Sequence, residues 1–178
     1  MDVKNKHIII FEGFDNTGKT TIAKELSSVL GIQYFKNPAE RERFKIPDLI
    51  DKEAIVEAQY LINFIKQVSL EGDGIVLDRH IPSHFVYSEV FRRNYDFEAV
   101  IKIDEELAKL GAILIYCYKT KTKTESYQDD LVDEFNRGLI SDFYEKYLKF
   151  TKMRFLKLDT TDEDIKKQFR VITNFIFE

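Results

Sequence analysis

Short apolar runs alternate along the chain with longer segments in which apolar residues recur every three or four positions. The short runs predict buried strands of a parallel sheet, and the helical spacing predicts helices that cover it. The predicted strands are 7–11, 32–35, 74–77, 113–118 and 154–158. The predicted helices are 19–30, 52–70, 82–91, 97–110, 129–150 and 162–177. This alternation indicates an α/β fold, with a five-stranded parallel sheet covered by helices on both faces.

A glycine-rich loop joins the first predicted strand to the first predicted helix. From Gly13 to Thr20 it fits G-x-x-x-x-G-K-[ST] at every position, in the context that this motif requires. Such loops bind phosphates through backbone N–H groups and a helix N-terminus, with the lysine on the β/γ-phosphates and the hydroxyl on Mg²⁺. The predicted phosphate-binding residues are Gly13, Asn16, Thr17, Gly18, Lys19, Thr20 and Thr21. The motif therefore predicts that the chain binds a nucleoside triphosphate.

Composition narrows the class of protein. With 178 residues, no linker-like segment and no repeat, we expect one domain over 1–178. A net charge of −4 argues against a broad basic surface, so no stable nucleic-acid complex is expected. The single cysteine, Cys117, excludes a disulfide framework and a multi-cysteine zinc site. The apolar run 8–11 is too short for a signal peptide or a membrane span, so we expect a cytoplasmic protein without a membrane partner.

The kind of nucleotide-binding protein follows from what accompanies the loop. A signalling GTPase would carry an N-K-x-D motif, which the sequence lacks, and a motor or AAA module would be larger. Asp78 and Arg79 follow the third predicted strand, at the sheet edge where the loop also lies. Asp78 is suited to hold a Mg²⁺-bound water or to orient the attacking oxygen, and Arg79 is suited to a bidentate phosphate contact. The alternative is that the two residues belong to a strand-end ion pair. The combination favours a small phosphotransferase.

The segments EGFDNTGKTT and LDRHIPSHFVY resemble the thymidylate kinase family, and Phe135-Asn136-Arg137 is similar to a patch that some members carry after their lid. The resemblance spans most of the chain. It implies a sheet order of 2-3-1-4-5, a homodimer, and small nucleotides as the binding partners. The implied reaction is phosphoryl transfer from ATP, with Mg²⁺, to a deoxynucleoside monophosphate such as dTMP.

The resemblance also implies roles for individual residues. Asp15 would accept a hydrogen bond from the 3′-OH of the acceptor, Arg79 would hold its phosphate, and Asp78 would organise magnesium. Ser83 would approach the base. Three further acceptor-binding candidates are Arg41, Tyr127 and Asn136. For Arg41, the alternative is a solvated side chain in a charged run.

Three positions depart from the family pattern. Ala58 falls where members commonly carry an arginine that reads the base, so the preferred base stays open. The lid-like segment 119–128 contains no arginine, although Lys119, Lys121 and Lys123 offer charge without a bidentate fork. The alternative is that these lysines belong to a solvated loop. Asn16 stands where one subgroup has an arginine.

These departures leave two rival hypotheses. One is a kinase that acts on a nucleoside or a modified nucleotide, which the alanine at position 58 favours. The other is a nucleotide-binding module with weakened or lost catalysis, which the shortage of lid arginines favours.

Overall fold

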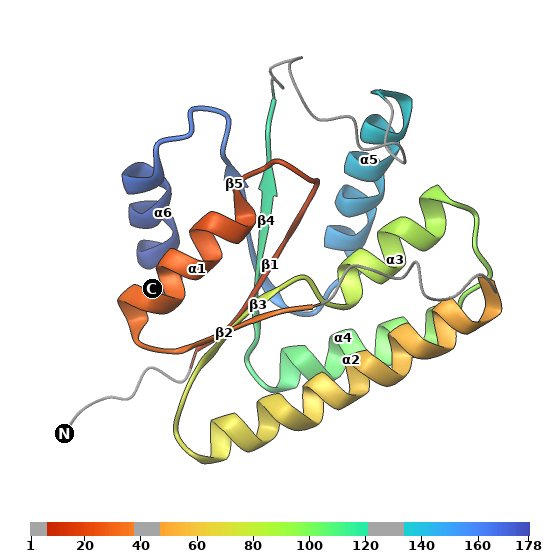
Figure 1. Cartoon of the computed structure of the whole chain (residues 1–178), viewed down its shortest axis with the longest axis horizontal. Helices are drawn as coiled ribbons and strands as arrows, with labels where there is room; N and C mark the ends of the chain where they lie inside the picture. Colours follow the sequence, from red (N-terminus) through yellow and green to blue (C-terminus); the bar gives the residue numbers. More distant parts are fainter. Residues whose placement is uncertain (1–6, 38–46, 121–133) are drawn as a thin grey trace.

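The computed structural model describes residues 7–37, 47–120 and 134–178, in which strands and helices alternate (Figure 1). The strands are β1 (Ile8–Gly13), β2 (Gln33–Lys36), β3 (Ile75–Asp78), β4 (Ile113–Tyr118) and β5 (Arg154–Asp159). The helices are α1 (Lys19–Leu30), α2 (Pro47–Leu70), α3 (Ile81–Val90), α4 (Phe97–Lys109), α5 (Glu134–Phe150) and α6 (Ile165–Phe177). Each strand and helix predicted from the periodicity is present.

The five strands form one parallel sheet in the order β2-β3-β1-β4-β5. Strand β1 lies in the middle, where Ile9 pairs with Val76 of β3 and with Ile113 of β4. The structure thus confirms the predicted fold class and strand order. All the strands of a parallel sheet end at the same edge, so the loop after β1 lies next to the end of β3.

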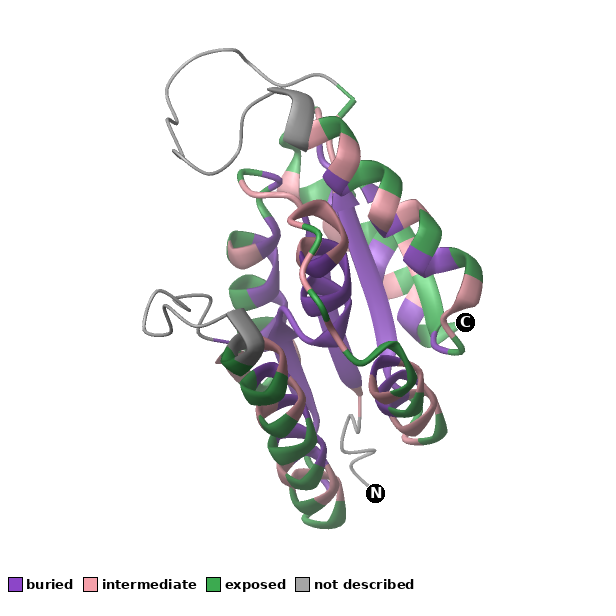
Figure 2. Cartoon of the chain, turned by 90° about the vertical axis from the view of Figure 1, so that its right-hand side faces the viewer, coloured by how far each residue is buried: buried purple, intermediate pink, exposed green. Residues whose placement is uncertain are grey.

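Alternate residues of the central strands face two separate hydrophobic cores. Ile8 and Ile10 of β1 pack with α2, α3, α4 and α5 on one face. Ile9 and Phe11 pack with α1 and α6 on the other face (Figure 1). The central strands are therefore buried on both sides, while the outer faces of the helices are exposed (Figure 2).

Gly13 allows the end of β1 to approach β4 closely. It has a φ of 137°, and a Cβ atom at this position would stand 2.1 Å from the carbonyl oxygen of Cys117. No residue with a side chain fits there without a shift of one strand. The first glycine of the phosphate motif is thus also required by strand packing.

The structure changes some predicted boundaries. Helix α2 begins at Pro47 rather than at residue 52. Proline suits the first turn of a helix, but this turn has no apolar repeat, so the periodicity did not indicate it. Asp78 is the last residue of β3, where it pairs with Phe11 and Lys36, and does not follow the strand. Residues 129–133 of the predicted fifth helix lie outside the described part. Within the described ranges, no helix is both long and apolar enough to cross a membrane.

Candidate active site

The phosphate loop leaves β1 at Gly13 and enters α1 at Lys19. Gly18 is the N-cap of α1 in the left-handed conformation, and Asn16 also has a positive φ of 64°. The Thr17 hydroxyl donates to the carbonyl oxygen of Phe14 over 2.8 Å, which closes the loop on itself. The first N–H groups of α1 have no partner within the helix and provide an anion-binding end.

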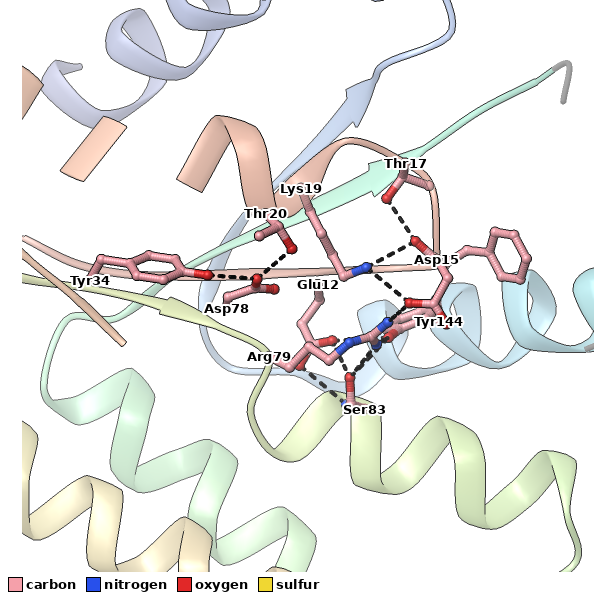
Figure 3. Close-up of polar contacts among 11 residues, drawn as sticks. Glu12, Asp15, Thr17, Lys19, Thr20, Tyr34, Asp78, Arg79, Ser83 and Tyr144 are labelled. Carbon is pink, nitrogen blue, oxygen red and sulfur yellow. Dashed lines mark hydrogen bonds and ion pairs between the residues drawn. The ribbon is translucent and has the colours of Figure 1, made fainter. Parts of the chain in front are cut away.

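Lys19 is folded back over this loop (Figure 3). Its Nζ donates to the Phe14 carbonyl over 3.1 Å and lies 3.4 Å from Asp15 Oδ1. Burial and the neighbouring Arg79 lower the pKa of Lys19, while the Asp15, Asp78 and Glu12 carboxylates oppose this effect. The ammonium therefore lies among acidic groups at the point where the motif predicts phosphate binding.

Thr20 and Asp78 meet beside the start of α1 (Figure 3). Asp78 Oδ2 accepts hydrogen bonds from the Thr20 hydroxyl over 2.6 Å and from the Tyr34 hydroxyl over 3.0 Å. Its Oδ1 is buried and has no partner among the described residues. An oxygen pair with a buried, unpartnered carboxylate oxygen fits a hard cation such as Mg²⁺. The structure thus brings together the two residues predicted to hold magnesium.

Arg79 crosses from the end of β3 to the phosphate loop. Its backbone has a φ of 73°, and its N–H donates to the Phe11 carbonyl over 2.9 Å. The guanidinium donates from Nη2 to Asp15 Oδ1 over 2.5 Å and from Nη1 to the Ser83 hydroxyl over 2.9 Å. The ring of Tyr87 lies 5.6 Å from the guanidinium carbon. Arg79 is therefore held on three sides by its own protein.

Glu12 anchors this arrangement from inside the protein. Its Oε2 accepts from the hydroxyls of Ser83 and Tyr144 over 2.6 and 2.9 Å, and its Oε1 accepts from the N–H of His80 over 2.7 Å. Burial raises the pKa of Glu12, although Arg79 and the hydrogen bonds act in the opposite direction. Glu12 and Tyr144 were not predicted as site residues. In the sequence, Glu12 is an acidic residue directly after the apolar run 8–11 and directly before the phosphate motif.

Asp15 connects the loop lysine to Arg79. Burial alone would raise the pKa of Asp15, but Arg79 and Lys19 lower it below the ordinary value. The carboxylate is thus ionised at neutral pH. Its side chain is 43% exposed, and no described residue bonds its Oδ2. One oxygen of Asp15 is therefore used within the protein, and the other has no hydrogen bond to the described residues.

Some predicted residues have contacts that differ from the expected ones, and others lie outside the described part. Thr21 is exposed on α1, and the Ser83 hydroxyl is used by Glu12 and Arg79. Arg41, Tyr127, Lys121 and Lys123 lie outside the described residues, and so does the side chain of Asn136 in the first turn of α5.

Two of the positions that depart from the family pattern are described. Lys119 donates to Glu163 over 2.8 Å, in the loop after β5. Ala58 is buried in the core beneath α2, so its place holds no polar group. The structure thus pairs one of the three lysines that could replace lid arginines.

Comparisons with known proteins agree with this geometry. No protein-family model matches the chain. The chain is 31% identical over 118 residues to a probable thymidylate kinase of Methanococcus aeolicus. The aligned part makes up 61% of this chain and 59% of that protein. The chain thus spans somewhat more than half the length of this relative. The predicted resemblance to thymidylate kinases is confirmed at this level.

Solved structures show the same fold. Thymidylate kinase from Candida albicans superposes with a TM-score of 0.67 at 16% identity, over 97% of this chain and 94% of that one. Deoxyadenosine kinase from M. mycoides with bound dATP superposes with a TM-score of 0.61 at 23% identity, over 96% of this chain and 100% of that one. The chain therefore has the α/β phosphate-loop fold of these kinases.

Proposed function

We propose that this protein transfers the γ-phosphoryl group of ATP to the phosphate of a deoxynucleoside monophosphate such as dTMP. One observation carries the proposal: Arg79, from the end of β3, and Lys19, from the phosphate loop, both contact the Asp15 carboxylate (Figure 3). A donor held by the loop and an acceptor held by Arg79 would thus lie next to each other. The sequence relative and the fold of the solved structures support the same class of reaction.

The donor side of the site consists of the loop and Lys19. The N–H groups of the loop and of the start of α1 would bind the phosphates of ATP, and Lys19 would turn from the Phe14 carbonyl to the β/γ-phosphates. Thr20 and Asp78 would hold Mg²⁺, with the unpartnered Asp78 Oδ1 as a ligand directly or through water. The ion would neutralise charge on the phosphate oxygens.

The acceptor side consists of Arg79 and the groups that brace it. Glu12 fixes Ser83 and Tyr144, and the Ser83 hydroxyl in turn holds Arg79. A guanidinium fixed in this way would bind the acceptor phosphate with little loss of side-chain freedom, once the phosphate replaced or shared its contacts with Asp15 and Ser83. The free Asp15 oxygen would accept from the 3′-OH of the sugar. Ser83, expected at the base, here supports Arg79.

Catalysis would rest on position and charge rather than on a covalent enzyme intermediate. An oxygen of the acceptor phosphate attacks the γ-phosphorus while the bond to the β–γ bridging oxygen breaks. Lys19 and Arg79 hold the two reactants in line and balance the negative charge of the transferred group. Because both contact Asp15, a change in the position of one is transmitted to the other.

A nucleoside acceptor is the second candidate, and one observation favours it. The Arg79 guanidinium already bonds Asp15 and Ser83, so an acceptor phosphate would have to replace or share these contacts. An acceptor without a phosphate would leave them intact. Ala58 adds to this argument, since it supplies no polar group to recognise thymine.

A coupled assay of ADP release separates the hypotheses. Wild type and Lys19→Met would be tested with ATP, Mg²⁺ and a panel of deoxynucleosides and their monophosphates. Turnover of a monophosphate, abolished in Lys19→Met, supports the proposal, and turnover of nucleosides alone supports the second candidate. Nucleotide binding without turnover of any acceptor would contradict both and indicate a binding module. The homodimer and the cytoplasmic location stay predictions of the sequence.

A further inference from the structure

The positive charge near the phosphate loop is largely committed to partners within the protein. Lys19 and Arg79 contact Asp15, and Lys119 pairs with Glu163. Position 16 of the loop is an exposed asparagine, which brings no charge. Phosphoryl transfer places extra charge on the equatorial oxygens of the transferred group, and an arginine commonly balances it. A further cation near the loop would therefore matter for the reaction.

Arg137 lies on the face of α5 that points toward the site. It precedes Tyr144 by seven residues, or two helical turns, and Tyr144 bonds Glu12. Ile140, between them, is fully buried on the same side. Seven residues of helical rise place Arg137 about 10 Å nearer the start of α5 than Tyr144. Helix α5 starts at the end of the molecule where the phosphate loop lies (Figure 1).

The Arg137 guanidinium lies against the phosphate loop itself. Its central carbon is 5.3 Å from the centre of the Phe14 ring. Phe14 packs against the core beneath α2–α5, and its carbonyl oxygen accepts from both Lys19 and Thr17. The residue that holds the loop lysine through its backbone thus holds Arg137 through its ring. Stacking on an aromatic ring orients a guanidinium and leaves its N–H edges available.

One of those N–H groups is buried without a partner. Arg137 Nε is inaccessible to solvent and has no hydrogen-bond partner among the described residues. A buried donor without an acceptor destabilises the protein, so such groups usually serve a ligand or a water. Next to a loop built for phosphates, the acceptor that fits a guanidinium best is a phosphate oxygen.

We propose that Arg137 is a catalytic arginine, which donates hydrogen bonds to the phosphoryl group as it passes from donor to acceptor. The proposal rests on the proposed kinase function. In the step, the bond from the γ-phosphorus to the β–γ bridging oxygen breaks and a bond to an acceptor oxygen forms. Arg137 keeps its proton throughout and balances charge only. It supplies the arginine that is absent from position 16 and from the described part of the lid segment, where Lys119 is paired with Glu163.

Steady-state kinetics of Arg137→Met test this role. Loss of a contact made mainly in the transition state lowers kcat by about 100-fold or more and changes each KM by less than about threefold. Arg137→Lys keeps the positive charge but not the two parallel donors of the guanidinium, so its kcat should be about tenfold higher than that of Arg137→Met. An unchanged kcat, or a loss confined to the KM of the acceptor, would overturn the proposal. Recovery of no activity by the lysine variant, with the fold intact, would also overturn it.

Arg154→Met is the matched control. Arg154 also lies over a phenylalanine, 4.2 Å from the centre of the Phe175 ring, but on the exposed edge of the molecule at β5 and α6. Arg154→Met removes the same charge and the same kind of stacking contact as Arg137→Met, but far from the phosphate loop. Its kcat should equal that of wild type, and urea unfolding of both variants should show that neither change disrupts the fold. A similar loss in both variants would point to a general charge effect and contradict the proposal.

A binding measurement separates failure of this proposal from failure of the kinase assignment. Calorimetry gives the affinity for MgADP alone and with aluminium fluoride, which mimics the phosphoryl group in transfer. Aluminium fluoride should tighten binding in wild type and Arg154→Met, and Arg137→Met should lose most of that gain while binding MgADP normally. If no acceptor is phosphorylated, the kinase assignment fails but this result still decides the role of Arg137. A wild type that shows no gain would overturn the proposal as well.

Discussion

The Arg79 guanidinium donates a 2.5 Å hydrogen bond to Asp15, which lies 64 residues earlier in the chain. The bond joins the end of β3 to the phosphate loop, so the predicted acceptor and donor residues form one unit. Both partners are polar groups that a ligand could also use. The contact therefore fixes the geometry in the absence of ligand and defines what a ligand must replace.

Removal of the Arg79 fork should weaken the acceptor more than the donor. In Arg79→Lys, a single ammonium replaces two parallel donors, so the KM of the acceptor should rise by about tenfold or more while that of ATP changes little. Initial rates over a grid of both substrates measure the two constants. Equal increases for both substrates would mean that Arg79 does not bind the acceptor.

Asp78→Asn should have a different kinetic effect. The amide keeps a hydrogen bond to Thr20 but removes the charge that fits a cation, so kcat should fall by about 100-fold and more Mg²⁺ should be needed for half-maximal rate. Magnesium titrations at saturating nucleotide measure both effects. Tyr34→Phe removes only the second hydrogen bond to Asp78 and serves as the control.

The sugar of the acceptor should be read by Asp15. Its unbonded oxygen would accept from a 3′-OH, and we expect deoxynucleotides to be preferred over ribonucleotides. A 3′-deoxy acceptor should lose about ten- to a hundredfold in kcat/KM, because the carboxylate is then left without its partner. Asp15→Ala should lose most of that discrimination. If wild type uses the deoxynucleotide and its 3′-deoxy analogue equally well, the sugar is recognised elsewhere.

Glu12 should be required for the fold as well as for the site. Glu12→Ala leaves two hydroxyls and two backbone N–H groups in the interior without an acceptor, and each unsatisfied group costs about 1–3 kcal/mol. The midpoint of urea unfolding should therefore fall strongly. Glu12→Gln keeps oxygen acceptors and should lose less. Similar midpoints for both variants would show that the charge of Glu12, rather than its hydrogen bonds, is what matters.

Cys117 should be unreactive in the folded protein. Burial raises the pKa of its thiol from 9.0 to about 12, so almost no thiolate exists at pH 8. Iodoacetamide should modify it only after unfolding. The folded state also binds this proton more tightly, so between pH 9 and 12 the free energy of unfolding should decrease as pH rises. In Cys117→Ala, this decrease in the free energy of unfolding should be smaller. Rapid labelling of Cys117 in the native wild type would contradict the prediction that its thiol is buried and unreactive.

The sequence allowed the prediction of those parts of the site that depend on local pattern. The phosphate loop and Asp78-Arg79 stand at strand ends, and a parallel sheet places such ends at one edge. The structure joins Thr20 and Asp78, which this rule places at the same edge, by a hydrogen bond. The two helix layers followed from the spacing of apolar residues in the same way.

The support of Arg79 could not be predicted in this way. Tyr144 lies 132 residues after Glu12, and only the packing of α5 against α3 brings its hydroxyl to that carboxylate. Its sequence signal was that of a core aromatic residue on a helix face. Arg137 likewise gave no signal beyond the similarity of a short patch, because its contact with Phe14 depends on where α5 begins. Contacts of this kind depend on the tertiary structure, and the spacing of residues along the sequence does not indicate them.

A glycine of the phosphate motif can be required either for binding phosphate or for the packing of the fold, and the close approach of Gly13 to Cys117 shows that the fold requires Gly13. A Cβ at Gly13 would collide with a carbonyl of β4, whereas one at Gly18 would meet only the tip of Ile22 at 3.9 Å. In a pooled mutational scan scored by cellular abundance, every substitution of Gly13 should therefore deplete the protein, even in cells where its activity is dispensable. The packing of β1 against β4 thus requires glycine at position 13 independently of phosphate binding. A related protein with the same sheet would keep this glycine even if it no longer bound a nucleotide.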